Sequence, residues 1–241
     1  MRVVKIDSAR STNAWIAEHG AELTAPTLVY AVEQTAGRGQ RGNSWEAQPG
    51  KNLTASALLV PDGVEPCRQF VISEAVALAV VDFLRGYGVE AKVKWPNDIY
   101  VGDRKICGIL IEHSIMGRQI MRTIAGIGVN INQEEFRSDA PNPVSVWQLT
   151  GNNHDIAEAA SALGEKIEER MEQMTQEGRL HAEFLANLWR GDGKLYPFRD
   201  VARGEEINAR IEEIAPDGIL TLMTADGDLR KYAFKEVEFL L

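Results

Sequence analysis

Cysteine is scarce in this sequence, and so are the usual marks of an extracellular or membrane protein. Only Cys67 and Cys107 occur in 241 residues, which excludes a disulfide framework. No apolar run approaches the roughly 18 residues that suggest a membrane span, and the opening segment MRVVKIDSAR lacks the apolar stretch of a signal peptide. The four histidines are scattered without the spacing of metal ligands. We therefore expect a cytoplasmic protein with neither a membrane span nor a structural zinc site.

Positive charge is also in short supply. Lysine and arginine number 26 against 35 aspartate and glutamate residues, which gives a formal net charge of −9. A protein that coats nucleic acid needs the opposite balance, because its cations displace counterions from phosphates. Any phosphate chemistry must therefore rest on a local group of cations. The 44% share of hydrophobic residues is ordinary for a chain with a packed core.

Hydrophobic patterning predicts an α+β fold. Runs rich in β-branched residues and bounded by Gly or Pro predict strands at 27–34, 52–60, 91–101, 106–115 and 119–132. The apolar segment 69–85 has no turn residue and predicts a buried helix. Apolar positions at steps of three or four predict a second helix from Asp155 to Gly178, and a shorter helix is expected over 180–189.

The composition changes after Trp189, where RGDGKLYPFRD is rich in Gly, Pro and charge. The segment from Ile207 to Leu241 consists of short alternating runs separated by turn signals, which is typical of a small β-barrel. We therefore predict two domains, a larger one over 1–190 and a C-terminal β-barrel over 195–241.

A glycine-rich loop, GRGQRG at 37–42, follows the strand predicted at 27–34. Its GxGxxG spacing also occurs in dinucleotide-binding proteins, but there the glycines open a helix. Here the loop runs into NSWEAQPGKNL, whose Pro and Gly disfavour a helix, so we reject a nicotinamide oxidoreductase. Backbone N–H groups with Arg38 and Arg41 could hold a polyphosphate. A merely solvated glycine loop is the alternative.

Two further segments carry candidate ligand-binding groups. KWPNDIYV at 94–101 and DRKICGILIE at 103–112 read as strand, turn and strand, which brings Lys94, Asn97, Asp98 and Lys105 near one another. A half-buried lysine needs a counter-charge, which a phosphate or a substrate carboxylate could supply. The alternative for Lys105 is an exposed hairpin lysine.

The third segment is GIGVNIN at 126–132. Gly126 and Gly128 in a strand allow a ligand to come close to the backbone, and Asn130 offers an amide for a base or a ribose. The alternative is a simple β-bulge at the glycines.

Taken in order, these segments resemble the biotin protein ligase family. The resemblance rests on Ser11-Thr12-Asn13, EQTAGRGQRGNSW at 33–45, KWPND, RKICGILIE and GIGVNIN, and it is strong over about residues 6–132. It implies a mixed β-sheet flanked by helices, with a small C-terminal β-barrel. It also implies ATP and Mg²⁺ as a substrate complex and biotin as the second substrate, with no bound prosthetic group. The reaction would form biotinyl-5′-adenylate and transfer biotin to a lysine of a biotin carboxyl carrier domain of a biotin-dependent carboxylase.

The resemblance also assigns roles to residues, and it assigns no metal ligands. It implies Arg38 and Lys105 as the catalytic residues, where positioning and charge neutralisation replace a nucleophile. The biotin site comprises Ser11, Thr12, Asn13, Gln34, Gly37, Arg38, Gly39, Gln40, Lys105, Gly108, Gly126 and Gly128. The nucleotide site comprises Arg38, Arg41, Trp45, Asn97, Lys105 and Asn130. Trp45 could equally anchor its loop in the core, and Asn97 and Asp98 could hold the site together or help to place magnesium.

Two departures from the family pattern carry expectations. Gln40 stands where the best-known members have arginine, so we expect weaker retention and more release of the free adenylate. The catalytic pattern starts by Ile6, which leaves no room for a helix-turn-helix domain, so we expect no operator binding. A monomer and a homodimer that pairs sheet edges both remain open. The alternative functions are a lipoate or octanoate ligase and a non-catalytic binder of biotin or adenylate.

Overall fold

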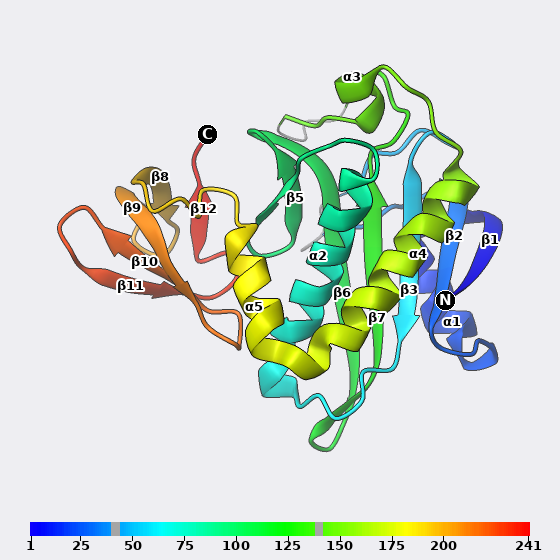
Figure 1. Cartoon of the computed structure of the whole chain (residues 1–241), viewed down its shortest axis with the longest axis horizontal. Coiled ribbons are helices and arrows are strands. Elements are labelled where there is room, and N and C mark those ends of the chain that lie inside the picture. Colours follow the sequence, from blue (N-terminus) through cyan, green and yellow to red (C-terminus); the bar gives the residue numbers. More distant parts are fainter. Residues whose placement is uncertain (40–43, 138–141) are drawn as a thin grey trace.

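A seven-stranded mixed sheet forms the larger part of the protein in a computed structural model that describes residues 1–39, 44–137 and 142–241 (Figure 1). The strand order is β1-β2-β3-β7-β6-β5-β4. β1 and β2 are parallel, and every other neighbouring pair is antiparallel. The strands are β1 Arg2–Ala9, β2 Thr27–Gln34, β3 Leu53–Leu59, β4 Lys92–Lys94, β5 Asp98–Val101, β6 Arg104–Met116 and β7 Gln119–Val129.

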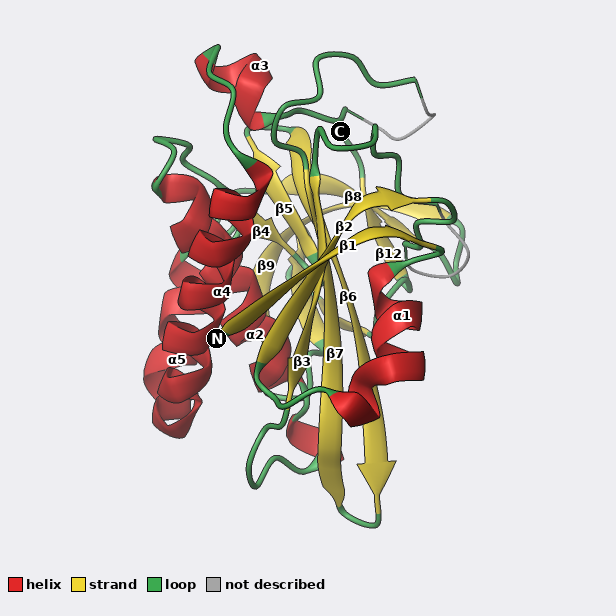
Figure 2. Ribbon diagram, turned by 90° about the vertical axis from the view of Figure 1, so that its right-hand side faces the viewer, coloured by secondary structure: helices red, strands yellow, loops and turns green. Residues whose placement is uncertain are grey.

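Helices cover both faces of this sheet (Figure 2). On one face lie α2 (Phe70–Arg85), α4 (Ile156–Glu172) and α5 (Glu177–Ala186), and on the other lies α1 (Thr12–His19). β3 is buried at all seven positions because it has helices on both sides. Alternate strand residues divide between the two faces; for example, Val29 packs with α1 while Leu28 belongs to the main core under α2.

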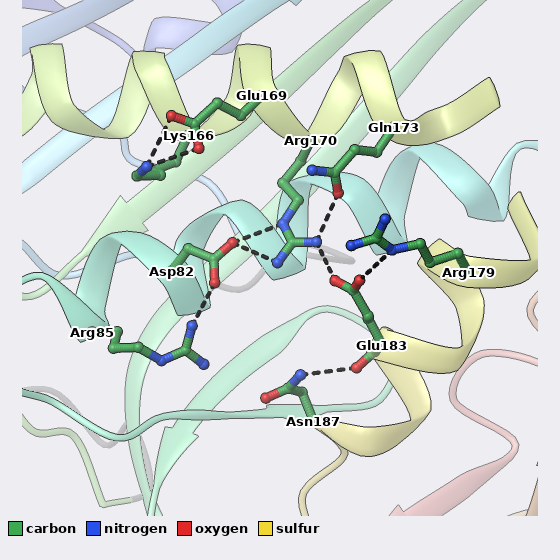
Figure 3. A network of polar contacts seen from close by, with 9 residues as sticks. All are labelled: Asp82, Arg85, Lys166, Glu169, Arg170, Gln173, Arg179, Glu183 and Asn187. Carbon is green, nitrogen blue, oxygen red and sulfur yellow. Dashed lines mark hydrogen bonds and ion pairs between the residues drawn. The ribbon is translucent and has the colours of Figure 1, made fainter. Parts of the chain in front are cut away.

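Ion pairs join the three helices of the main layer across their outer surface (Figure 3). The guanidinium of Arg170 on α4 lies 2.7 Å from Asp82 on α2 and also contacts Glu183 on α5. Its side chain is only 13% exposed, so these contacts are better shielded from water than ordinary surface pairs. Arg85 and Arg179 extend the network from either side. The network fixes the three helices relative to one another above the sheet.

Shorter helices complete the larger part. They are α3 (Val146–Thr150) and the 3₁₀ helices η1 (Gly20–Glu22), η3 (Pro66–Arg68) and η4 (Gln173–Gln176). The side chain of Ser145 caps the start of α3, and Gly151 ends it with φ of 74°. None of the helices in the described part of the chain is long and apolar enough to span a membrane.

The C-terminal part is a five-stranded antiparallel sheet in the order β11-β10-β9-β8-β12. The strands are β8 Tyr196–Asp200, β9 Glu205–Ile214, β10 Leu220–Thr224, β11 Leu229–Tyr232 and β12 Val237–Phe239. The prediction of a closed barrel is corrected here to an open sheet. Closure needs a ladder between the two edge strands, and among the described residues none joins β11, which has four residues, to β12, which has three.

Several predicted elements are revised. The strand predicted at 91–101 is two strands, β4 and β5, because Pro96 has no N–H for a ladder and a turn forms around it. The helix predicted from Asp155 to Gly178 ends at Glu172, and a 3₁₀ turn leads into α5. The predicted domain boundary between 190 and 195 stays a prediction.

Candidate active site

A cavity of about 730 Å³ lies where the large sheet meets the C-terminal sheet. Thirteen of the residues predicted for the site line it, and they come from segments as far apart in sequence as the start of α1 and the end of β7. They are Ser11, Thr12, Asn13, Gln34, Arg38, Gly39, Trp45, Asn97, Lys105, Gly108, Gly126, Gly128 and Asn130.

Three other predicted residues are not placed on this wall. Gly37 is described but does not line the cavity. Its carbonyl accepts the N–H of Trp45 at 3.0 Å, and a Cβ on Gly37 would lie 2.8 Å from the carbonyl oxygen of Trp45. The glycine is therefore needed for close backbone pairing. Gln40 and Arg41 lie outside the described residues.

The start of α1 forms one end of the cavity. Ser11 Oγ accepts a backbone N–H of the first turn at 3.2 Å, as an N-cap residue does. The backbone N–H of Thr12 donates to Gln34 Oε1 at 2.8 Å, which ties the helix to the end of β2. Ser56 Oγ lies 2.6 Å from both Thr12 Oγ1 and Asn13 Oδ1. The result is a buried cluster of hydroxyl and amide groups at the cavity wall.

Glu112 on β6 joins this cluster to the glycine-rich loop. Asn13 Nδ2 donates to Glu112 Oε2 at 2.7 Å and to the carbonyl of Leu110 at 3.2 Å. Arg38 Nη2 lies 3.4 Å from the same Glu112 oxygen. Because both charged side chains are about half exposed, this ion pair is weak and Arg38 can exchange it for a substrate anion.

The strand glycines allow two side chains to lie flat against the sheet. A Cβ on Gly126 would lie 2.4 Å from Asn13 Oδ1, and a Cβ on Gly128 would lie 2.4 Å from the Trp45 indole. A Cβ on Gly108, on the neighbouring strand β6, would lie 3.0 Å from the same indole. The glycines are therefore required by close approach rather than by a bulge, since β7 pairs regularly through both positions.

Two described residues of the cavity lining carry a buried polar atom without a partner. Among the described residues, four buried side-chain atoms have no hydrogen-bond partner, and two of them, Trp45 Nε1 and Asn130 Oδ1, belong to residues that line the cavity. Asn130 uses its amide nitrogen to bond the carbonyl of Val144 at 3.0 Å, which leaves the oxygen free. Leaving such atoms unpaired costs free energy. A ligand with both a donor and an acceptor would satisfy them.

Lys105 supplies positive charge beside the Trp45 indole, with its Nζ 5.7 Å from the centroid of the ring. Its Nζ lies 2.7 Å from Asp98 Oδ1, and both side chains are about a quarter exposed. Asn97 holds the hairpin in place, because its Nδ2 donates to the carbonyl of Ile109 at 2.5 Å and its carbonyl accepts the N–H of Ile109 at 2.9 Å. The two roles considered for Asn97 and Asp98, holding the site together and helping to place magnesium, stay predictions. Among the described residues, no group of three His, Cys, Asp or Glu side chains is placed to hold a metal ion.

Lys94 is a second cation on this wall. Its Nζ donates to the hydroxyl of Tyr100 at 2.9 Å and lies 4.5 to 5.6 Å from the rings of Tyr100, Trp189 and Phe239. Burial lowers the pKa of the Lys94 ammonium, and nearby charges shift it in both directions. Burial raises the pKa of the Tyr100 hydroxyl, because here too it disfavours the charged form. An anion beside Lys94 would stabilise its charged form.

Sequence reasoning missed several residues of this site. Glu112 lies within the segment RKICGILIE, but nothing in its spacing indicated contact with Asn13. The C-terminal residues carried no motif, and only tertiary packing brings them to the cavity. The missed residues include Ser56, Glu112, Tyr100, Lys235, Val237 and Phe239.

Comparison with known proteins defines the class. Residues 5–130, just over half of the chain, match the biotin/lipoate A/B protein ligase family. The protein therefore belongs to this family.

Particular relatives narrow the comparison. Over 144 residues the chain is 36% identical to the bifunctional ligase/repressor BirA of Bacillus subtilis, a match that covers 59% of this chain and 41% of that protein. It is 34% identical over 160 residues to the biotin–[acetyl-CoA-carboxylase] ligase of Paracoccus denitrificans. This match covers 64% of this chain and 66% of that protein. The chain thus spans about two fifths of the Bacillus relative. The fold is similar to that of the biotin protein ligase from Aquifex aeolicus in complex with biotin and ATP, with a TM-score of 0.81 at 22% identity over 98% of this chain and 97% of that one.

Proposed function

We propose that this protein is an ATP-dependent biotin ligase that acts on a biotin carboxyl carrier domain. The observation that carries the proposal is the meeting of all five sequence segments of the resemblance on one cavity. The family match and the relatives named as biotin ligases support the same assignment.

In the first half-reaction, a carboxylate oxygen of biotin attacks the α-phosphorus of MgATP. The bond to the β-phosphate breaks, and biotinyl-5′-adenylate and pyrophosphate form. Such a displacement needs positioned cations rather than a protein nucleophile. Cys107 supports this view, because it is fully buried and burial raises the pKa of its thiol, which leaves it inert.

The proposed roles follow the position of each group on the wall. Lys105 neutralises charge on the biotin carboxylate and the α-phosphate, after exchanging its contact with Asp98 for the substrate. Arg38 contributes in the same way from the loop. Trp45 and Asn130, each with a buried unpaired atom, face the nucleotide.

The buried cluster around Thr12 and Asn13 is proposed to bind the ureido ring of biotin. Hydroxyl and amide groups there can exchange their mutual hydrogen bonds for bonds to the ring. The apolar dithiolane of lipoate or the chain of octanoate could not make these bonds, so the cluster would select against them. This polarity favours biotin over the alternative acids used within the same family.

In the second half-reaction, the ε-amine of a carrier lysine attacks the acyl carbon of the adenylate. The bond to the phosphate oxygen breaks, AMP leaves, and the amine loses a proton as the amide forms. We expect this to take place in the cytoplasm. The net charge of −9 gives the protein no general attraction to DNA phosphates. A monomer and a homodimer that pairs sheet edges are both compatible with this proposal.

The test is transfer of biotin to a purified biotin carboxyl carrier domain, followed by intact-mass spectrometry. We expect one biotinyl group per carrier with MgATP and biotin, and none on a carrier whose acceptor lysine is replaced by arginine. Modification with lipoate or octanoate instead would show that the protein is a lipoate or octanoate ligase. Absence of any product with all three acids would favour a non-catalytic binder.

A further inference from the structure

The turn that joins β11 to β12 contains a lysine in an unfavourable backbone conformation. The N–H of Glu236 donates to the carbonyl of Ala233 at 3.1 Å, which closes a four-residue turn. Lys235, the third residue, has φ of 70°. Glycine is the residue preferred at this position of such a turn, because it has no Cβ.

At other positions with positive φ, the described residues are mostly glycine. In the described parts of the sequence, ten glycines have positive φ, against only Asn142, Arg190 and Lys235 among other residues. Asparagine tolerates the conformation well. Of the three, only Lys235 lines the cavity. A residue kept in a disfavoured conformation beside a ligand site suggests that its side chain is needed there.

Aromatic packing holds this turn against the KWPND segment. The ring of Phe234 lies 5.3 Å from that of Trp95 and 6.1 Å from that of Phe70. Trp95 Nε1 also donates to the carbonyl of Gly218 at 3.0 Å, in the loop between β9 and β10. Lys235 is therefore carried by a turn that is fixed to the same segment as Lys94.

The charge balance of the cavity identifies the ligand that suits Lys235. Besides Lys235, the described lining includes the cations Arg38, Lys94 and Lys105 and the two acids Asp98 and Glu46. Asp98 pairs with Lys105. The Glu46 carboxylate accepts hydrogen bonds from the Gln133 side chain and the Arg137 backbone. With Glu112, which pairs with Arg38 beside the cavity, these described residues comprise four cations and three acids, so positive charge is in excess by one within a protein of net charge −9.

We infer that Lys235 binds the β- and γ-phosphates of ATP and stabilises them as pyrophosphate leaves. The inference rests on the proposed function, and it gives the C-terminal sheet a direct part in nucleotide binding. Lys105 addresses the α-phosphate, so a further cation on the facing sheet suits the other two phosphates. The energetic cost of the turn is retained because the charge is required at this point.

Four proteins test the inference: wild type, Lys235→Gln, Lys235→Arg and Lys235→Gly. Glutamine removes the charge and keeps the Cβ, arginine keeps both, and glycine removes both. Calorimetric titration, with and without biotin, measures the Kd of a non-hydrolysable MgATP analogue and that of AMP. For the analogue we expect a rise of about tenfold in the Gln and Gly variants and a value near wild type in the Arg variant. The Kd of AMP should stay within about twofold in all four.

The glycine variant separates loss of the charge from loss of the fold. It relieves the backbone, so we expect it to unfold at a temperature equal to or above that of wild type even as analogue binding weakens. Analogue affinity unchanged in both the Gln and Gly variants would overturn the inference. Slower transfer from preformed adenylate to the carrier, with analogue binding unchanged, would assign Lys235 to the carrier and also overturn it. Because the titration requires no turnover, absence of biotinylation by wild type would refute the proposed function without deciding the role of Lys235.

Discussion

Replacing either of two glycines on β7 by alanine should weaken substrate binding, and each replacement should disturb a different part of the cavity. Gly126 and Gly128 are two residues apart and so face the same side of the sheet. In Gly126→Ala the new Cβ would lie 2.4 Å from Asn13 Oδ1, and in Gly128→Ala it would lie 2.4 Å from Trp45 Cε2 and 2.6 Å from Trp45 Nε1. Carbon atoms in ordinary contact are about 3.5 to 4.0 Å apart, so each side chain must move by about 1 Å.

The cost for Gly126→Ala follows from the bonds that Asn13 would lose. Its Oδ1 lies 2.6 Å from Ser56 Oγ, and its Nδ2 donates at 2.7 Å to Glu112. A shift of about 1 Å carries both beyond hydrogen-bond distance. An Asn13 displaced in this way is also out of place for the ureido ring, and two lost bonds to biotin at about 0.5 to 1.5 kcal/mol each correspond to a rise of about 5- to 150-fold in its KM. Gly128→Ala should instead raise the KM for ATP, because it displaces the indole.

The assay is pyrophosphate exchange with each substrate varied at saturation of the other. Gly178→Ala is the matched control, because nothing lies within 4 Å of a Cβ at that position on α5. Circular dichroism establishes that each variant is folded. Equal effects of both strand substitutions on both substrates, or no effect from either, would refute the assignment of the two ends of the cavity.

Two further predictions concern stability. Burial raises the pKa of Glu74, although a 2.6 Å hydrogen bond and the charge of His181 oppose the shift. A carboxyl of raised pKa stabilises the fold below its ordinary value of 4.5 and loses that contribution as pH rises through the folded pKa. The advantage of Glu74→Gln in thermal unfolding should therefore grow from about pH 4 to about pH 8, and a pH-independent difference would contradict the reasoning. Arg170→Met should cost about 1 to 2 kcal/mol, because it removes the shielded central cation and leaves Asp82 and Glu183 only their more exposed partners Arg85 and Arg179. Lys166→Ala, at an exposed pair on the same helix, should cost under about 0.5 kcal/mol. Chemical denaturation measures both, and similar values would argue against the network of Figure 3.

Elements with strong local patterns were predictable from the sequence. The helix predicted over 69–85 is α2, Phe70–Arg85, because a long apolar run without a turn residue suits a helix that is buried on most of its faces. The predicted strands around 27–34 and 119–132 were also found. β1 and α1 were not predicted, since β1 is only partly buried and its register depends on pairing with β2, 25 residues further along the chain. The open form of the C-terminal sheet depends on where β12 pairs, which no local signal encodes.

The residues of the site also divide into those that the sequence indicated and those that only the fold brings together. Segments with glycines and cations could be selected as candidates because their chemistry is visible in the sequence. The bond from Asn13 to Glu112 spans 99 residues, and its existence depends on the register of β6 against α1. The positive φ of Lys235 likewise arises from a turn closed by tertiary packing. Contacts of this kind depend on the assembled fold and cannot be read from spacing.

The most direct test of the central proposal is pyrophosphate exchange by purified protein with MgATP and either biotin or lipoate, comparing wild type with Lys105→Ala. We expect exchange that depends on biotin in wild type and a loss of at least about a hundredfold in the variant, because in the proposed mechanism Lys105 neutralises the charge that develops at the α-phosphate. Exchange that depends on lipoate, or biotin-dependent exchange that survives in Lys105→Ala, would contradict the account.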